Sequence, residues 1–592
     1  MNASNFIKTK LFYITLIFSV FVLNGFAQSS LSVDVGKADA IVNKEIFGGL
    51  MERLGRGVNG GVFVGTSGSN QTNGLRNDII EGLKECGFGA LQWPGGCAAQ
   101  NYNWNPPNPS NDLGTDRFMQ LCELTGCTPI ITGRSNDTYS ASNKAWVRYI
   151  NDNPDHPDWY LKYFQIGNEV WGCGGNFGSW SAYKPSYNRN YDSLHIPVND
   201  KPISTIAGTD GIWRYEQWLK DMMAEQANRI DNIEIHDYIY YPDDIHSLNF
   251  SDNDYYNILN LANEGQMRPR LDGIISILNR YDPDNRIKIW EGEWGNWLID
   301  NGDQWQQYGT LMDALSAGET LNLFVKYAHR MLGAGLAQVI NVIHSIMNTE
   351  SANGPMVKTP TFYVFKCYIP HHTDNAKSAP FNLTSEKVSN IPAISAAATV
   401  NDFGHVNVSL TNIDMNQSKK VNITLANTEH AYICSLAQVV TGPAKNSYNH
   451  YNQTPEVELD TVPSICSKSG DKTFSITLPK MSIALVSLRP DPPLTSTVQP
   501  GTLVKKRRED AFSIHIGSYG KMHISSPLNR KAPITISLYS IDGKSLINSL
   551  PRTLEPGNNS CILKCTTIGK GAYIVKLRGT GVDFSKKIVV TK

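Results

Sequence analysis

Apolar and polar positions follow three successive patterns along the 592 residues of the chain. Over residues 46–380, short apolar or β-branched runs alternate with longer amphipathic segments, as in GALQWPGG, TDRFMQLCELTG, TPIITGRSN, IEIHDYIYYP, LDGIISILNRYD and IKIWEGEWGNW. Repeated strand-then-helix segments predict a parallel α/β fold. We therefore expect a (β/α)8 TIM barrel over 46–380. A doubly wound sheet is the alternative, but no Gly-rich phosphate loop opens any of the expected helices.

The second and third patterns are those of β-structure. Over residues 381–490, segments such as AISAAATVNDFGHVNVSLTN and KTFSITLPKMSIALVSL alternate apolar and polar residues between turn signals, which predicts an antiparallel β-sandwich. The early strand SSLSVDV, within 28–45, is expected to join this sandwich. A Pro-rich stretch over 491–511 predicts a linker. The segments ITISLYSIDGKSL, GAYIVKL and KKIVVTK predict a small β module over 512–592.

The first residues have the features of an export signal. Lys8 and Lys10 precede the apolar stretch LFYITLIFSVFVLNGFA, in which Gly25 and Ala27 have the small side chains that a signal peptidase recognises. We expect a signal peptide over 1–27. A transmembrane anchor is the alternative, but the run is short for a bilayer span and contains polar residues. The expected product is a secreted or cell-surface protein with no stable membrane insertion.

Composition narrows the range of partners. The chain has 53 Lys and Arg residues against 54 Asp and Glu residues, a net charge of −1, so bulk electrostatics attract neither nucleic acid nor an anionic membrane. The 12 Trp and 26 Tyr residues suit the faces of sugars, although most aromatic residues of any large protein lie in its core. Composition therefore permits a carbohydrate-active protein without arguing for one.

Ten cysteines are too few for a dense disulfide scaffold in a chain of this length. No CxxC pair or Cys/His cluster has zinc-site spacing, so we expect no metal site. Cys97 and Cys173 both follow expected barrel strands, at the end of the barrel that carries the active site, and we predict a disulfide between them. Two free buried thiols are the alternative.

The segment YFQIGNEVWGCGG contains the first candidate catalytic residue. An apolar strand ends at Gly167 and is followed by Asn168 and Glu169. In a parallel α/β barrel, catalytic groups lie at the C-terminal ends of the strands. The same Asn-Glu dipeptide recurs at Asn263 and Glu264, so the dipeptide alone does not identify a site.

The segment IKIWEGEWGNWL supplies a second candidate. Hydrolysis of a glycosidic bond requires two carboxyl groups on opposite sides of the anomeric carbon. Glu291 and Glu293 lie at the end of an apolar strand, and because they are two residues apart we expect both to point to the same face. Spacing alone does not choose between them.

Several motifs, in this order, resemble those of glycoside hydrolase family 51, the α-L-arabinofuranosidases. They are IFGGLMERLGR, LQWPGGCAAQNYNWN, GTDRFMQLCELTGC, YFQIGNEVWGCGG, IEIHDYIYYP, EGEWGNW, AQVINVI and TPTFYVF, and they extend over about 33–368. The resemblance implies a (β/α)8 barrel, retention of anomeric configuration, and no metal or organic cofactor. It also implies an acid/base Glu after Asn on the fourth strand and a nucleophile on the seventh.

Carried over to this chain, the resemblance makes Glu169 the acid/base and Glu293 the nucleophile. Retention predicts that the two carboxyl groups lie roughly 5 to 5.5 Å apart. Asn168 resembles the residue that hydrogen-bonds the sugar 2-hydroxyl.

Four further residues match substrate-binding positions of the family. Glu52 matches a carboxylate that binds substrate hydroxyls, with a salt bridge to a nearby arginine as the alternative. His236 and Tyr238 match a His-x-Tyr motif on the sixth strand, whose Tyr hydroxyl orients the nucleophile. Trp297 resembles an aromatic wall of the sugar site.

The chain departs from the family pattern at several positions. Gln92 stands where family members commonly have Arg, and Gly292 stands where they often have Asp. The residues Ala98, Ala99 and Gln100 replace the usual aromatic or acidic residues after the Gly-Gly pair. These departures bear on substrate preference, whereas the two carboxyl groups that define the reaction are present.

We therefore expect an exo-acting enzyme that removes terminal α-L-arabinofuranosyl groups from plant cell-wall polysaccharides such as arabinoxylan and arabinan, or from their oligosaccharides. One alternative is an endo-glucanase or xylosidase on the same barrel, in which an open cleft around Gln92, Cys97 and Trp297 replaces a closed pocket. The other is a non-catalytic surface glycan-binding protein. The segment 512–592 resembles type IX secretion sorting domains, which implies the secretion machinery as a partner; a small Ig-like module is the alternative.

Overall fold

The computed structural model describes residues 29–493, except 197, 210–215, 241–244 and 299–304, and of the C-terminal part only seven strands between 513 and 590. The predicted signal peptide and most of the predicted linker lie outside these residues. The chain divides into two compact units, 1–496 and 497–592, and each is described by itself. Within the described residues, no helix has the length and apolar character needed to cross a bilayer.

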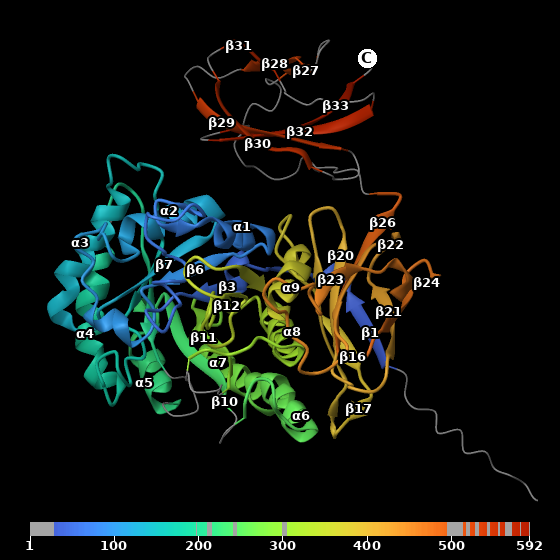
Figure 1. The fold of residues 1–592 in the computed structure, drawn as a ribbon, viewed down its shortest axis with the longest axis horizontal. Coiled ribbons are helices and arrows are strands. Elements are labelled where there is room, and N and C mark those ends of the chain that lie inside the picture. The colour runs from blue at the N-terminus through green and yellow to red at the C-terminus, as the bar shows by residue number, and fades with distance from the viewer. Residues whose placement is uncertain are drawn as a thin grey trace, which may run out of the picture. The chain divides into compact units, whose positions relative to one another are not determined.

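The first unit contains a closed barrel of eight parallel strands, shown from blue to yellow in Figure 1. The strands pair in the order β10-β11-β12-β3-β6-β7-β8-β9, so the barrel closes between β9 and β10. This confirms the predicted (β/α)8 barrel and excludes the doubly wound sheet. The barrel strands are β3 (Gly48–Leu50), β6 (Ala90–Trp93), β7 (Thr128–Gly133), β8 (Tyr163–Ile166), β9 (Ser204–Gly208), β10 (Asn232–Tyr240), β11 (Lys288–Trp297) and β12 (Met331–Leu336).

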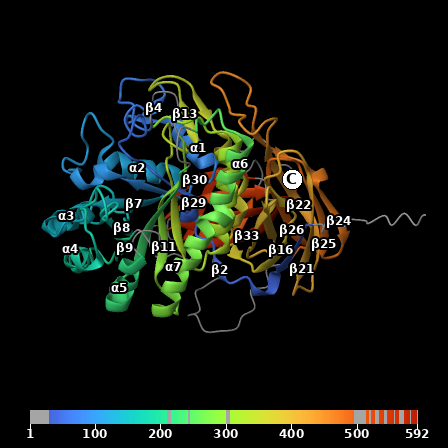
Figure 2. The same cartoon turned by 90° about the horizontal axis from the view of Figure 1, so that it is seen from below.

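Helices surround the barrel, and Figure 2 shows α3, α4 and α5 outside β7, β8 and β9. Most are amphipathic and bury one face against the strands. The helices are α1 (Asn77–Glu85), α2 (Gly114–Thr125), α3 (Ser140–Asn151), α4 (Trp180–Leu194), α5 (Glu216–Gln226), α6 (Asp252–Asn260), the π-helix η6 (Leu261–Gly265), α7 (Met267–Tyr281), α8 (Leu311–Lys326) and α9 (Pro360–Cys367). The 3-10 turns are η1 (Val35–Lys37), η2 (Lys44–Phe47), η3 (Cys97–Asn101), η4 (Asp137–Tyr139), η5 (Ala227–Arg229), η7 (Ile369–His371) and η8 (Pro463–Ile465).

Helix α8 is buried on every side because it lies between the barrel and the sandwich. Its residues from Leu311 to Val325 are all buried, and it contacts β11 as well as β19 and β20. A capping box between Thr310 and Asp313 fixes its start. Asn322 donates to the hydroxyls of residues on both β19 and β20, which links the helix to the sandwich.

Two antiparallel-rich sheets form the sandwich, as the alternating pattern predicts. The blue strand β1 lies among its orange strands in Figure 1, paired with β21 and β16. The five-stranded sheet has the order β16 (Phe381–Thr384), β1 (Ser29–Asp34), β21 (Lys419–Ala426), β25 (Thr473–Leu478) and β24 (Cys466–Gly470). The seven-stranded sheet has the order β2 (Ala40–Ile41), β15 (Lys377–Ser378), β19 (Ile394–Val400), β20 (Val406–Asn412), β26 (Ser482–Asp491), β22 (Ala431–Thr441) and β23 (Glu458–Thr461).

Short paired strands lie in the connecting loops. They are β4 (Gln71–Thr72) with β5 (Leu75–Arg76), β13 (Met347–Thr349) with β14 (Met356–Lys358), and β17 (Lys387–Val388) with β18 (Ile391–Pro392). The second unit, taken alone, has one sheet of β27 (Ser513–Ile516), β28 (Lys521–Ser526) and β31 (Gly557–Ile562). Its other sheet has the order β30 (Ser545–Leu554), β29 (Ala532–Ser540), β32 (Gly571–Gly579) and β33 (Val582–Val590).

The barrel interior has an apolar layer and a polar layer. The apolar cluster consists of Ala90, Ile130, Tyr163, Ile206, Trp290 and Leu332. In the polar layer, the Gln92 amide donates to Thr132 Oγ1 and Gln165 Oε1, each at 2.9 Å, and accepts from Trp290 Nε1. Gln92 is therefore wholly buried, and the expectation that it forms part of a substrate wall is wrong. Its hydrogen bonds to three strands and its position below the mouth of the barrel make it a core residue.

Candidate active site

Glu169 lies in the loop that follows β8, the fourth barrel strand along the chain. The strand ends in buried Gln165 and Ile166, and Glu169 adopts a backbone φ of +44°, a left-handed conformation that few non-glycine residues take. The Glu169 carbonyl accepts hydrogen bonds from the amides of Gly172 at 2.7 Å and Gly174 at 3.1 Å. These bonds hold the loop so that the partly exposed carboxylate lies at the mouth of the barrel.

Strand β11, the seventh, carries Glu293 on its inner face and Glu291 on its outer face. Glu291 pairs with Ile235 of β10, whereas Glu293 pairs with the next residue, His236, so Gly292 is an extra residue in β11. Paired residues of parallel strands share a face, and neighbours along a strand do not. The expectation that both glutamates point to one face is therefore wrong, because the bulge at Gly292 reverses their alternation.

His236 and Tyr238 come from β10 and both reach the nucleophile candidate. The Tyr238 hydroxyl donates to Glu293 Oε2 at 2.8 Å. His236 Nδ1 lies 3.2 Å from Glu169 Oε1 and 3.6 Å from Glu293 Oε2. One carboxylate oxygen of Glu169 and one of Glu293 lie within 4.8 Å of each other. The structure thus brings both candidate carboxyl groups together around one imidazole.

The electrostatic state of this group follows from burial and from neighbouring charges. Burial raises the pKa of Glu293, the charge of Glu169 raises it further, and His236 and the Tyr238 hydroxyl act in the opposite direction. Burial lowers the pKa of His236, but the charges of Glu293 and Glu234 and the hydrogen bonds to Glu169 and Glu234 outweigh it, so that this pKa lies well above its usual value. The neighbouring carboxyl groups therefore favour the protonated form of the imidazole.

Glu52 follows β3 and forms the third carboxyl group of the site. Burial, followed by the charges of Glu293 and Glu169, raises the pKa of Glu52 to about 8. The Gln338 amide donates to Glu52 Oε2 at 3.0 Å. A Cβ on Gly96 would lie 1.6 Å from Glu52 Oε1, so only glycine allows the carboxylate this close to the loop after β6.

The arginines near Glu52 have other partners. Arg53 forms an ion pair with Asp112, and Arg56 donates to Thr349. The alternative interpretation of Glu52, a salt bridge to a nearby arginine, is therefore not what the structure shows.

Asn168 and Trp297 complete the residues that were expected to bind substrate. Asn168 is buried and lowers the pKa of Glu293, yet neither of its amide atoms meets hydrogen-bond geometry with a described residue. Trp297, at the end of β11, places its ring 5.0 Å from the ring of Tyr238 and 5.5 Å from that of Trp305. An aromatic group of three rings thus borders Glu293.

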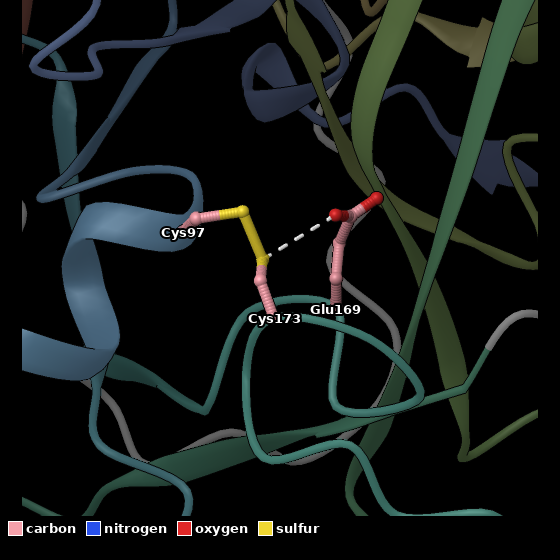
Figure 3. A group of neighbouring side chains, drawn as sticks. All are labelled: Cys97, Glu169 and Cys173. Carbon is pink, nitrogen blue, oxygen red and sulfur yellow. Dashed lines mark hydrogen bonds between the residues drawn. A yellow bond between two sulfur atoms is a disulfide. The ribbon is translucent and has the colours of Figure 1, made fainter.

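The predicted disulfide between Cys97 and Cys173 is present, with 5.4 Å between the Cα atoms. Cys97 begins η3, after β6, and Cys173 shares the loop of Glu169, so the bond joins the loop after β6 to the loop that holds Glu169 (Figure 3). Cys173 Sγ lies 3.6 Å from Glu169 Oε2. A disulfide sulfur has no proton to donate, so this contact is one of packing.

Comparison with known proteins agrees with this geometry. Residues 292–482 match the model of the α-L-arabinofuranosidase C-terminal domain. An intracellular exo-α-L-arabinofuranosidase of Bacteroides ovatus is 29% identical over 527 residues, which cover 81% of this chain and 100% of that protein. The crystal structure of a GH51 arabinofuranosidase from Xanthomonas axonopodis pv. citri has a TM-score of 0.70 at 27% identity, covering 78% of this chain and 100% of that chain. The chain is an arabinofuranosidase-type glycosidase.

A further relative is α-L-arabinofuranosidase C of Emericella nidulans, which is 25% identical over 441 residues, 65% of this chain and 84% of that protein. The matches together relate the enzyme to the family 51 α-L-arabinofuranosidases. The chain has Gly292 where members of that family often have Asp, and the neighbouring side chains explain this difference. A Cβ at this position would lie 2.9 Å from His236 Nε2 and 3.2 Å from Glu234 Oε1, so a larger side chain would displace both.

Sequence reasoning missed two residues of the enzyme's site, Gln338 and Glu234. Gln338 hydrogen-bonds Glu52 through its side chain, and Glu234 Oε1 lies 2.8 Å from His236 Nε2. Both stand within motifs that carried the resemblance, AQVINVI and IEIHDYIYYP. The alternation of Glu234, His236 and Tyr238 along one strand was the available signal, because such residues share a face.

Proposed function

We propose that the enzyme is a retaining exo-α-L-arabinofuranosidase, with Glu169 as acid/base and Glu293 as nucleophile. The observation that carries the proposal is the approach of the two carboxylates to within 4.8 Å. Retaining enzymes need carboxyl groups about 5 to 5.5 Å apart, whereas inverting enzymes leave about 6.5 to 9.5 Å for a water molecule. The exo-acting relative from Bacteroides ovatus supports exo action.

In the first step, Glu169 donates its proton to the glycosidic oxygen while Glu293 attacks the anomeric carbon and forms a glycosyl ester. The hydrogen bond from Tyr238 holds Glu293 in position for this attack. Burial keeps the Tyr238 hydroxyl protonated, since it raises the pKa of Tyr238 well above its usual value. In the second step, Glu169 removes a proton from water, which hydrolyses the ester and releases arabinose.

Three residues are the proposed contacts of the sugar. Glu52, oriented by Gln338, faces the two catalytic carboxyl groups closely enough for their charges to raise its pKa. The Asn168 amide beside the nucleophile suits the sugar 2-hydroxyl, because its buried polar atoms gain partners when that hydroxyl binds. Trp297 offers an aromatic face to the C–H side of the ring. We propose arabinose-containing plant polysaccharides and their oligosaccharides as substrates.

Hydrolysis of an aryl α-L-arabinofuranoside by the purified full-length enzyme tests the proposal. The first anomer seen by proton NMR should be the α form, as retention requires. A β anomer would contradict the roles of Glu169 and Glu293. Absence of hydrolysis by folded protein would instead favour a glycan-binding protein. An endo enzyme would lower the viscosity of a polysaccharide long before free arabinose appears.

We also propose that the enzyme is exported and that its C-terminal unit is read by the secretion machinery. The basis is the signal-like sequence at 1–27 together with the β-rich segment 512–592, which resembles type IX sorting domains. Fractionation of cells producing the full chain tests this. Enzyme found in the medium or on the surface only when the C-terminal unit is present supports the proposal, whereas equal export without that unit contradicts it.

A further inference from the structure

Glu234 is a buried carboxyl group next to the proposed catalytic residues, and it has no role in the two proposed steps of hydrolysis. It lies on β10, on the same face as His236 and Tyr238, and is fully buried. Its Oε1 accepts hydrogen bonds from Gln165 and from His236, the latter over 2.8 Å. Glu234 therefore connects the polar layer of the barrel interior to the imidazole.

His236 has a carboxyl group at each ring nitrogen. Nε2 faces Glu234, and Nδ1 faces both Glu169 at 3.2 Å and Glu293 at 3.6 Å. An imidazole donates from both nitrogens only when it is protonated. A neutral ring that donates from Nε2 to Glu234 would direct its Nδ1 lone pair towards the ionised Glu293. Since the side chain is only 4% exposed, water does not relieve that repulsion.

We propose that Glu234 is a positioning residue, which holds His236 as an imidazolium between the acid/base and the nucleophile. The inference depends on the proposed roles of Glu169 and Glu293. Glu234 does not touch the sugar in this scheme, because it lies on the far side of the imidazole ring from both catalytic carboxyl groups.

The movement of charge during the reaction explains why such a cation is useful. Before the first step the negative charge is on Glu293, and afterwards Glu293 is an uncharged ester while Glu169 is ionised. The second step returns the charge to Glu293. His236 Nδ1 lies at similar distances from both groups, so one imidazolium stabilises either state without moving far.

The surrounding titratable groups favour the same protonation state. Glu169, Glu234 and Glu293 face His236 from three different elements, and their effects together raise its pKa. Burial raises the pKa of Glu234 to about 7, while His236 lowers it. Of the more distant groups, Tyr238 and Glu52 feel the charges of Glu293 and Glu169, and Glu291 on the outer face of β11 feels the charge of His236.

The experiment is an NMR titration of the histidine ring protons, with the signal of His236 assigned by its loss in His236→Asn. In the full-length wild-type enzyme we expect His236 to remain protonated at about pH 8, where an unperturbed histidine is neutral. In Glu234→Gln we expect it to lose its proton at lower pH. The same variant should lower kcat by about 10-fold to 100-fold, with KM changed by less than about threefold, and should alter the alkaline side of the pH profile.

Two variants separate positioning from a structural role. Glu291→Gln makes the same chemical change at a buried site on the next strand that has no hydrogen bond to the ring, and it should shift the His236 titration less than Glu234→Gln does. Glu234→Asp keeps the carboxylate charge and should restore part of the upward shift in the pKa of His236. Equal titration of His236 in wild type and Glu234→Gln would overturn the proposal, as would loss of activity with an unchanged pH profile in both position-234 variants.

Two outcomes remain decisive if a variant does not fold or the enzyme proves inactive. A wild-type His236 that is neutral at about pH 8 overturns the inference without any variant. A wild-type enzyme that does not hydrolyse arabinofuranosides, but in which Glu234→Gln still shifts the titration of His236, refutes the proposed function and leaves the positioning role intact.

Discussion

The two faces of strand β11 each bury a glutamate, but their surroundings differ. On the inner face, Glu293 receives a hydrogen bond from Tyr238 and lies beside His236. On the outer face, both carboxyl oxygens of Glu291 lack a hydrogen-bond partner among the described residues, and its charged neighbours are Asp237 and Arg270. Burial raises both pKa values. A raised pKa therefore does not identify the catalytic group, whereas oriented donors and a second carboxyl group do.

The largest difference between the faces should appear on replacing each glutamate by glutamine. Glu293→Gln should lower kcat by about 10⁴-fold or more, because the amide cannot form the glycosyl ester. Glu291→Gln should change kcat by less than about twofold. Initial rates on an aryl α-L-arabinofuranoside measure both. Comparable losses in the two variants would show that the outer face also serves the chemistry.

Removal of the proposed acid/base, Glu169, should lower activity by an amount that depends on the leaving group of the substrate. Glu169→Ala should lower kcat/KM on arabinan by about 10²-fold to 10⁴-fold, because the sugar leaving group needs a proton. A substrate with a good leaving group, such as a nitrophenol, should lose far less in the first step. External azide should speed turnover of that substrate by replacing the activated water. The same loss on both substrates would contradict the acid role.

The disulfide joins the loop after β6 to the loop of Glu169, on the inner side of β11. We therefore expect its removal to lower thermal stability and to leave the surroundings of Glu291 unchanged. It closes a segment of 76 residues, for which the chain-entropy model gives about 4 kcal/mol. Cys97→Ser with Cys173→Ser should therefore lower Tm by about 4 °C in a unit of this size. Reducing agent should lower the wild-type Tm by the same amount and leave the double variant unchanged. A further fall in the reduced variant would mean that another disulfide contributes.

A smaller effect should appear in the pH dependence of stability. Folding raises the pKa of the Glu291 carboxyl group well above its ordinary value of 4.5. At any pH between the ordinary pKa and the native pKa, the native state keeps a proton that the unfolded chain releases. The stability that is present below pH 4.5 is therefore lost as the pH rises through the native pKa. Glu291→Gln cannot titrate, so its Tm should fall less than that of wild type as the pH rises above 4.5. Parallel curves would contradict this.

The smallest effect should come from removing the second unit, because the candidate catalytic residues all lie in the first unit. A chain ending at Pro500 keeps the unit 1–496. Its kcat/KM on an aryl arabinofuranoside should match that of the full chain within about twofold. Loss of activity in folded, purified protein would show that the C-terminal unit supports the barrel.

The sequence predicted the features that depend on local pattern or on ordered motifs. Strand-helix alternation predicted the barrel, strand-end position made Glu169, Glu291 and Glu293 candidates, and the family resemblance chose Glu169 and Glu293. The positions of Cys97 and Cys173 after barrel strands predicted their disulfide. Each of these follows from periodicity, from the family's ordered motifs, or from the rule that the strand ends of a parallel barrel meet at one rim.

Features that depend on the pairing of distant strands were not predictable. The bulge at Gly292 exists only in the register of β11 against β10, and it decides which of Glu291 and Glu293 faces inward. Gln92 was expected near the substrate wall because it stands where family members commonly have Arg, but its partners Thr132, Gln165 and Trp290 come from three other strands. A buried hydrogen-bond network of this kind produces no periodic pattern of apolar and polar residues in the sequence.

The pairing of β1 with β21 has a consequence for how the chain is made. Ser29 is the register partner of Val421, and 421 minus 29 is 392 residues. At a synthesis rate of about 5 to 20 residues per second, Ser29 waits roughly 20 to 80 seconds for its neighbour to emerge. The barrel can form during that interval, but the sandwich cannot. Because β1 must pair with β21, this sheet is completed only after nearly the whole first unit has left the ribosome.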